Sequence, residues 1–69
     1  MLSKEEKVII RVLKKLKIDQ DTIIGIMLKV KDNKQYQNSL IEYLRTLNYT
    51  ATRTMVLQKV REITGGPAV

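Results

Sequence analysis

The 69-residue chain contains no cysteine, histidine, phenylalanine or tryptophan, and it has only three glycines and one proline. Without cysteine no disulfide can form, and without cysteine and histidine a structural zinc site has none of its usual ligands. The same two absences remove the commonest general base and the thiol nucleophile. We therefore predict that the protein is not an enzyme and that it binds no metal, no cofactor and no small-molecule substrate.

The carboxylates and glycines that are present do not change this expectation. Five of the seven acids lie where predicted helices begin, where capping and the helix dipole account for them: Glu5, Glu6, Asp19, Asp21 and Asp32. The glycines are Gly25, Gly65 and Gly66, and they do not have the spacing of a phosphate-binding loop. The composition thus favours a binding protein over a hydrolase or a nucleotidase.

Long hydrophobic runs are also missing. The longest apolar run near the N-terminus is Val8–Ile10, far shorter than a signal-peptide core or the ~20 residues that cross a membrane. Binding at a membrane surface would require the apolar stripe of the first helix to leave the core. We therefore expect no membrane partner, and the lack of cysteine fits a cytoplasmic location.

The apolar residues recur at helical spacing along the whole chain, with no alternating strand pattern. A chain of this length builds one domain around one core. We predict an all-α fold, a compact bundle of four short helices. Residues 1–64 form the single domain, and residues 65–69, which contain Gly-Gly-Pro, form a flexible C-terminal tail.

The first two predicted helices differ in pattern. Ser3 and Glu6 form a capping box, so the first helix begins at Lys4 and continues to about Leu16. Asp19 or Asp21 caps a second helix that covers Thr22 to about Val30 and is apolar over most of its circumference. Such a helix is either the buried centre of the bundle or carries a partner-binding face. Its narrow polar strip consists of Thr22, Gly25 and Lys29.

Gly25 has two possible explanations. It either admits another backbone closely, or it lies in an exposed strip that tolerates a glycine.

The last two helices are expected to follow each other closely. Asp32 or Asn33 begins the third helix, and Asn48 is a suitable left-handed terminator. The fourth helix covers about Ala51 to Ile63, with Thr50 or Thr52 as its cap. A link of about three residues predicts a tight corner or hairpin between them, similar to a helix-turn-helix unit.

Thirteen lysines and arginines outweigh seven aspartates and glutamates, which gives a net charge of +6. Residues 1–17 carry six bases and two acids (+4), residues 18–50 carry four of each (0), and residues 51–69 carry three bases and one acid (+2). The excess charge therefore belongs to the first and last helices. If their bases share one face, a nucleic-acid partner is favoured, whereas bases that diverge around an apolar patch favour a protein partner.

The first basic surface is an uninterrupted arc on the first helix. Five bases at helical spacing can follow a phosphate backbone, because neutralised phosphates release their counterions, or they can bind an acidic protein. Alternatively, the arc is a solvated face that keeps a small domain soluble. Its members are Lys4, Lys7, Arg11, Lys14 and Lys15.

The second basic surface is on the fourth helix, which carries the side-chain types that contact base edges in helix-turn-helix proteins. Arg53 lies in the first turn, where the helix dipole disfavours a cation, and a local rule broken without compensation can mark a functional site. Alternatively, the threonines serve only as caps and the stem of Arg53 covers the core. The predicted contact residues are Thr52, Arg53, Thr54, Gln58, Lys59 and Arg61.

Residues 23–63 contain IGIMLKVKDN, then SLIEYLRTL, then a threonine-led helix that ends in VREI. In its hydrophobic spacing this segment resembles small uncharacterised helical proteins of Gram-positive bacteria and their mobile elements. The resemblance implies an all-helical domain and assigns no activity, cofactor or site to any residue.

These observations predict a small, basic, non-catalytic binding module that binds DNA or acts as a regulator. The N-terminal half of the fourth helix would contact DNA, and the arc on the first helix would add contacts to the backbone. The alternative is a protein–protein interaction module, such as a homodimer, that uses apolar surface on the second helix.

Overall fold

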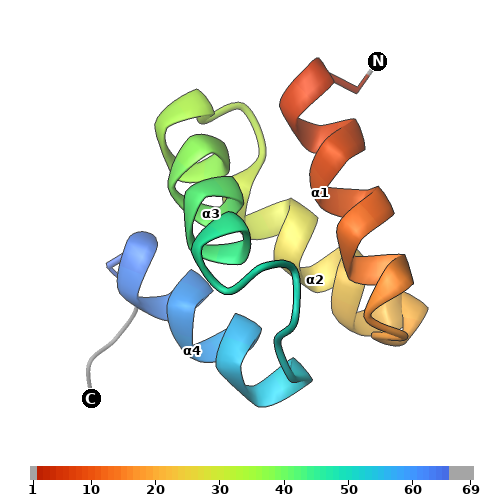
Figure 1. Cartoon of the computed structure of the whole chain (residues 1–69). Helices are drawn as coiled ribbons and strands as arrows, with labels where there is room; N and C mark the ends of the chain where they lie inside the picture. The colour runs from red at the N-terminus through yellow and green to blue at the C-terminus, as the bar shows by residue number, and fades with distance from the viewer. Residues whose placement is uncertain (1, 66–69) are drawn as a thin grey trace.

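A computed structural model describes residues 2–65 of the chain and contains four helices (Figure 1). They are α1 (Lys4–Lys15), α2 (Gln20–Val30), α3 (Lys34–Thr46) and α4 (Arg53–Ile63). No strand occurs in residues 2–65, so the all-α prediction is confirmed. Gly65 has φ 65°, as expected for a glycine that follows a helix. Residues 66–69 of the predicted tail lie outside the described residues.

A side-chain cap begins each helix. The capping box of α1 is complete, because Ser3 N donates to Glu6 Oε1 at 2.8 Å and Glu6 N donates to Ser3 Oγ at 3.1 Å. For each of the other helices, one of the two predicted alternatives is the cap: Asp19 for α2, Asn33 for α3 and Thr52 for α4. Local sequence signals therefore fix where the helices begin.

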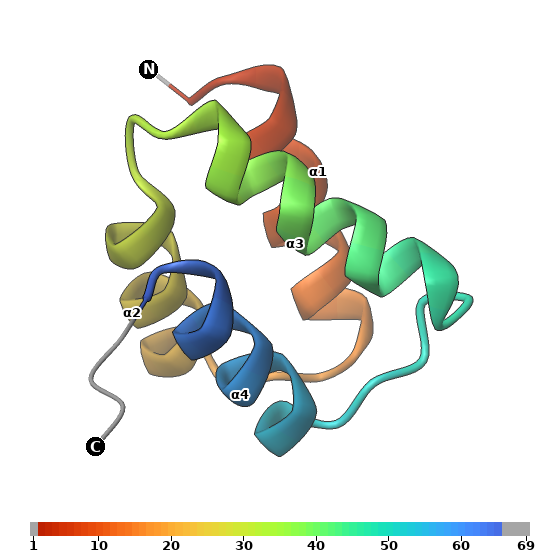
Figure 2. The same cartoon turned by 90° about the vertical axis from the view of Figure 1, so that its left-hand side faces the viewer.

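α1 and α4 pack on different sides of the α2–α3 pair, and all four helices surround one core. α1 packs against α2 and α3, and α4 packs against the same two helices from another side (Figures 1 and 2). Within residues 2–65, α1 and α4 do not pack against each other. The core draws on all four helices and the α1–α2 link: Ile9, Leu13, Ile18, Ile23, Ile26, Leu40, Leu44, Val56 and Val60.

One polar side chain is buried at the end of this core. Gln37 is 2% exposed, its Nε2 donates to the carbonyl oxygen of Val30 at 2.9 Å, and its Oε1 accepts from Ser3 Oγ at 3.3 Å. Gln37 thereby satisfies a carbonyl at the C-terminus of α2 that has no partner within its own helix. The contact also fixes the start of α1 beside the end of α2.

α2 is not the buried centre of the bundle. Its Ile24 and Leu28 are 49% and 67% exposed, whereas Ile23 and Ile26 face the core. Of the two interpretations of this helix, the structure therefore shows one with an exposed apolar face. A Cβ at Gly25 would meet no neighbouring atom within 4 Å, so a close approach of another backbone does not explain this glycine.

The connection between α3 and α4 is longer than the three residues that were predicted. α3 ends at Thr46 and α4 begins at Arg53, which leaves six residues, 47–52, between them. Asn48 and Tyr49 both have φ 58°, and Tyr49 N donates to Leu44 O at 2.8 Å. Two consecutive left-handed residues turn the chain back, so α4 returns alongside α3 (Figure 2).

Candidate anion-binding groove

The structure divides the predicted contact residues of α4 between two sides of the helix. Arg53 and Arg61 lie on the side that borders α2, whereas Lys59 lies on the side that borders α3. Thr52, Thr54 and Gln58 are exposed. The six predicted residues therefore do not form one cluster, and only the two arginines belong to a shared hollow.

That hollow is a groove of ≈ 280 Å³ between α2 and α4. Three of its eight lining residues are bases and none is an acid, and the buried side chains of Ile26 and Val60 lie at its base. The absence of a side chain at Gly25 leaves the α2 wall open. The lining residues are Thr22, Gly25, Ile26, Lys29, Arg53, Leu57, Val60 and Arg61.

Lys29 is the one base of this groove that was not predicted from the sequence as a contact residue. Together with Thr22 and Gly25 it forms the narrow polar strip of α2, and in the structure this strip is one wall of the groove. The strip itself was visible in the sequence. The sequence did not show which helix borders this strip, because helical periodicity defines the faces of each helix but not how the helices pack together.

Arg53 is held in place by the start of α2. Its Nε donates to Thr22 Oγ1 at 3.0 Å and lies 3.3 Å from Asp19 Oδ1. Thr22 Oγ1 in turn donates to Asp19 Oδ1 at 2.7 Å. The cation in the first turn of α4 therefore has a compensating partner, so the sequence argument that Arg53 breaks a rule without compensation is wrong.

The same contacts determine the electrostatics of Asp19. Its Oδ2 accepts from the backbone N–H of Thr22 at 3.0 Å, which caps α2. The hydrogen bonds from the Thr22 side chain and backbone hold the pKa of Asp19 below its ordinary value, and the nearby Arg53 adds a smaller effect in the same direction. Asp19 thus stays ionised and links the first turns of α2 and α4.

Arg53 keeps binding capacity despite these contacts. Its side chain is 60% exposed, and within residues 2–65 only Nε donates a hydrogen bond, which leaves the terminal N–H groups available. Lys29 and Arg61 are exposed and take part in none of the ion pairs among the described residues. The three positive charges of the groove are therefore at most partly neutralised by the protein itself.

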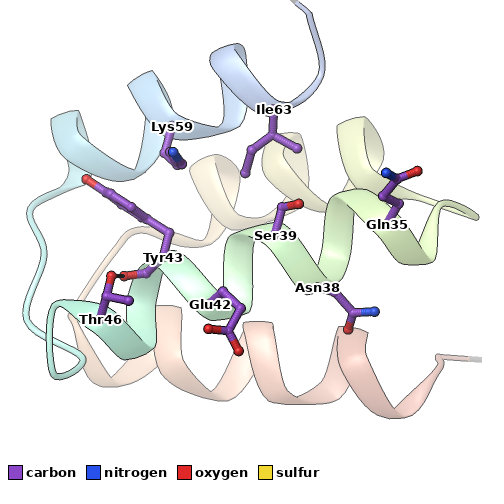
Figure 3. Close-up of a pocket in the computed structure, with 8 residues that line it drawn as sticks. All are labelled: Gln35, Asn38, Ser39, Glu42, Tyr43, Thr46, Lys59 and Ile63. Carbon is purple, nitrogen blue, oxygen red and sulfur yellow. Dashed lines mark hydrogen bonds between the residues drawn. The ribbon is translucent and has the colours of Figure 1, made fainter.

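Lys59 lies in a different environment, a shallow groove between α3 and α4 (Figure 3). Its Nζ is 5.1 Å from the centroid of the Tyr43 ring and 3.5 Å from Glu62 Oε1. This cation is already paired, and Glu42 also lines the groove. The α3–α4 groove mixes charges of both signs, so it is a poorer anion site than the α2–α4 groove.

The five predicted bases of α1 are all exposed: Lys4, Lys7, Arg11, Lys14 and Lys15. They do not join the α2–α4 groove, because α1 packs on the other side of α2 and α3 (Figure 1). The exposed Ile24 and Leu28 belong to α2, which lies between the two basic helices. The bases of α1 and α4 therefore do not share one face, and the exposed apolar side chains lie on the helix between them.

Residues 2–65 thus form a small all-helical fold with a basic groove between α2 and α4. Comparison with protein-family models, with curated proteins and with solved structures gives no match. The resemblance to helical proteins of Gram-positive bacteria stays a prediction. Among residues 2–65, no helix has the length and apolar character needed to cross a bilayer, and no three side chains of the metal-binding types come together.

Proposed function

We propose that the protein is a non-catalytic DNA-binding module that holds backbone phosphates in the α2–α4 groove. One observation carries the proposal: Lys29, Arg53 and Arg61 come from two helices and line one groove that has no acidic lining residue. Neutralised phosphates release counterions, so a few such bases supply much of the affinity of a protein for DNA. Arginine also donates to phosphate oxygens in a bidentate manner.

The length of the groove fits a chain of phosphates better than a single ion. Arg53 and Arg61 are eight positions apart on one helix, which corresponds to about 12 Å along the helix axis. This separation lets the two arginines contact different phosphates of one DNA strand. Thr54 and Gln58 are exposed between these arginines and offer hydrogen-bonding groups to base edges.

The arc of bases on α1 has a secondary place in this proposal. The molecule measures 30 × 27 × 24 Å, and α1 lies on another side from α4 (Figure 2). At about 0.1 M salt the Debye length is about 10 Å, so charges that far from the bound duplex are largely screened. The arc therefore increases the association rate at low salt and contributes little at physiological salt.

Anisotropy of a labelled DNA duplex at several salt concentrations tests the proposal. The double variant Lys29→Gln with Arg61→Gln removes two groove charges, and we expect the slope of log K against log salt to fall by about 1.8. Arg53 is left intact because it also holds α2 to α4. The matched control is Lys34→Gln with Arg45→Gln, which removes two exposed charges from α3. Arg45 is comparable to Arg61 because each lies in the last turn of its helix.

The control should change the slope by well under one unit. No binding of the wild-type protein at low salt would refute the proposal, as would equal losses in the two double variants.

A protein-interaction module is the second candidate, because Ile24 and Leu28 are exposed on α2. These side chains lie on a different side of the helix from the α2–α4 groove. The two candidate functions therefore use separate surfaces and can be tested separately.

A further inference from the structure

The outer face of α2 carries a symmetrical pattern of exposed residues. Asp21, Ile24 and Leu28 are exposed at spacings of three and four positions, which place them on one face of α2, and the exposed Lys31 is the C-cap residue that directly follows the helix. Ile24 and Leu28 lie two positions before and after residue 26, and Asp21 and Lys31 lie five positions before and after it. Two apolar side chains thus occupy the centre, with Asp21 at one end and Lys31 at the other, where the exposed Asp32 also lines the adjoining groove.

This pattern is self-complementary in one orientation. If two copies meet with their α2 helices antiparallel, a twofold axis near residue 26 places Ile24 against Leu28 of the second copy. The same axis places Asp21 of each copy against Lys31 of the other copy, so two such pairs form. A parallel pairing would instead place like charges opposite each other, which is unfavourable.

The groove between α1 and α2 extends the same pattern. It is lined by the exposed Leu2 and by Ile10 and Met27, so apolar surface continues from α2 towards α1. The Gln37 contacts with Ser3 and Val30 place the start of α1 beside the end of α2. Glu6 therefore lies at one end of the groove and Lys14 at the other, and an antiparallel pairing also brings these two opposite charges towards each other.

We propose that α2 is a homodimer interface, occupied by α2 of a second copy in antiparallel orientation. An ordinary interface covers about 800 Å² per partner, which is about a sixth of the 4931 Å² surface of this chain. The α1–α2 groove provides eleven lining residues for it, and these include three of the four large exposed hydrophobics among residues 2–65.

The proposal names the partner of the second candidate function, the protein-interaction module, as another copy of this chain. It does not depend on DNA binding. Lys29 and Gly25 lie on the α4 side of α2, so a dimer would leave both α2–α4 grooves open. Self-association is measured without nucleic acid. A monomeric protein that binds DNA would therefore overturn only the dimer, and a dimer that ignores DNA would overturn only the proposed function.

Sedimentation equilibrium over a wide range of protein concentration provides the test. We expect reversible dimers, and Leu28→Glu should weaken them at least about 100-fold, because two buried leucines are lost per dimer. The matched control is Tyr49→Asn, which removes the remaining large exposed hydrophobic and suits the left-handed backbone there. This control should leave self-association unchanged.

A charge exchange then tests the orientation. Asp21→Lys and Lys31→Asp should each weaken the dimer by about tenfold, because two facing pairs become repulsive. The double variant that exchanges the two charges should restore the wild-type affinity. Circular dichroism of each variant confirms that it is folded.

Three results would overturn the proposal. These are a monomer at every concentration, a dimer that Leu28→Glu leaves intact, and a double charge variant that is weaker than either single one.

Discussion

Substitution of Gly25 by alanine should stabilise the protein. Gly25 lies in the interior of α2, it is not among the residues with positive φ, and a Cβ there meets no atom within 4 Å. Alanine is favoured over glycine in a helix interior by about 1 kcal/mol, and nothing in the surroundings opposes that gain. For a domain of this size, such a gain corresponds to a rise in Tm of about 4–8 °C.

Thermal and urea unfolding followed by circular dichroism measure this effect. An unchanged or lower stability would refute the reasoning, because it would mean that another group approaches Gly25 closely or that α2 is not helical there.

The same position also links stability to function. Gly25→Glu adds a carboxylate beside Lys29, Arg53 and Arg61, so we expect DNA binding to be lost while the fold stays at least as stable as the wild type. Gly25→Gln is the matched control of equal size and no charge. If the glutamine variant loses binding to the same extent, steric blocking and not charge is the cause.

Two further predictions concern stability. Gln37→Leu should cost about 1 kcal/mol in urea unfolding, because the Val30 carbonyl keeps only the longer hydrogen bond from Asn33 N at 3.3 Å and Ser3 Oγ loses its acceptor. Gln35→Leu, at an exposed position of the same helix, should change little. Asp19 has a folded pKa below its unfolded value of about 3.9, so its contribution is present above that pH and is lost as the pH falls through the folded value. Asp19→Asn should therefore make the free energy of unfolding depend less on pH in the acid range, and an unchanged pH dependence would contradict the account.

The helices and their caps could be predicted from the sequence because their causes are local. Ser3 and Glu6 satisfy each other's backbone groups three positions apart, and this contact needs no other part of the chain. Asp19, Asn33 and Thr52 each accept a hydrogen bond from the backbone N–H three positions further along the chain, which is an equally local contact. The choice between neighbouring candidate caps, such as Asp19 and Asp21, required the structure.

The features that were missed depend on which helix faces meet. Lys29 belongs to the groove only because the polar strip of α2 borders α4, and Gln37 is buried only because the end of α2 offers it a carbonyl. The partner of Arg53 is Asp19, 34 positions away in the sequence. No periodicity within a single helix carries this information.

The length of the α3–α4 link was missed for another reason. Asn48 was expected to end α3, but Tyr49 also adopts the left-handed conformation, which is unusual for a bulky residue. These two residues occupy part of the longer connection and are held by the hydrogen bond from Tyr49 N to the Leu44 carbonyl. The rest of the difference arises because Thr52, the later of the two predicted caps, begins α4.

The location of the phosphate-binding surface is tested most directly by NMR titration with a short DNA duplex. Binding in the α2–α4 groove predicts that the largest backbone amide shift changes occur at Gly25 and Lys29 and along α4 from Arg53 to Arg61. Changes confined to α1 or α3, or no changes at low salt, would contradict it.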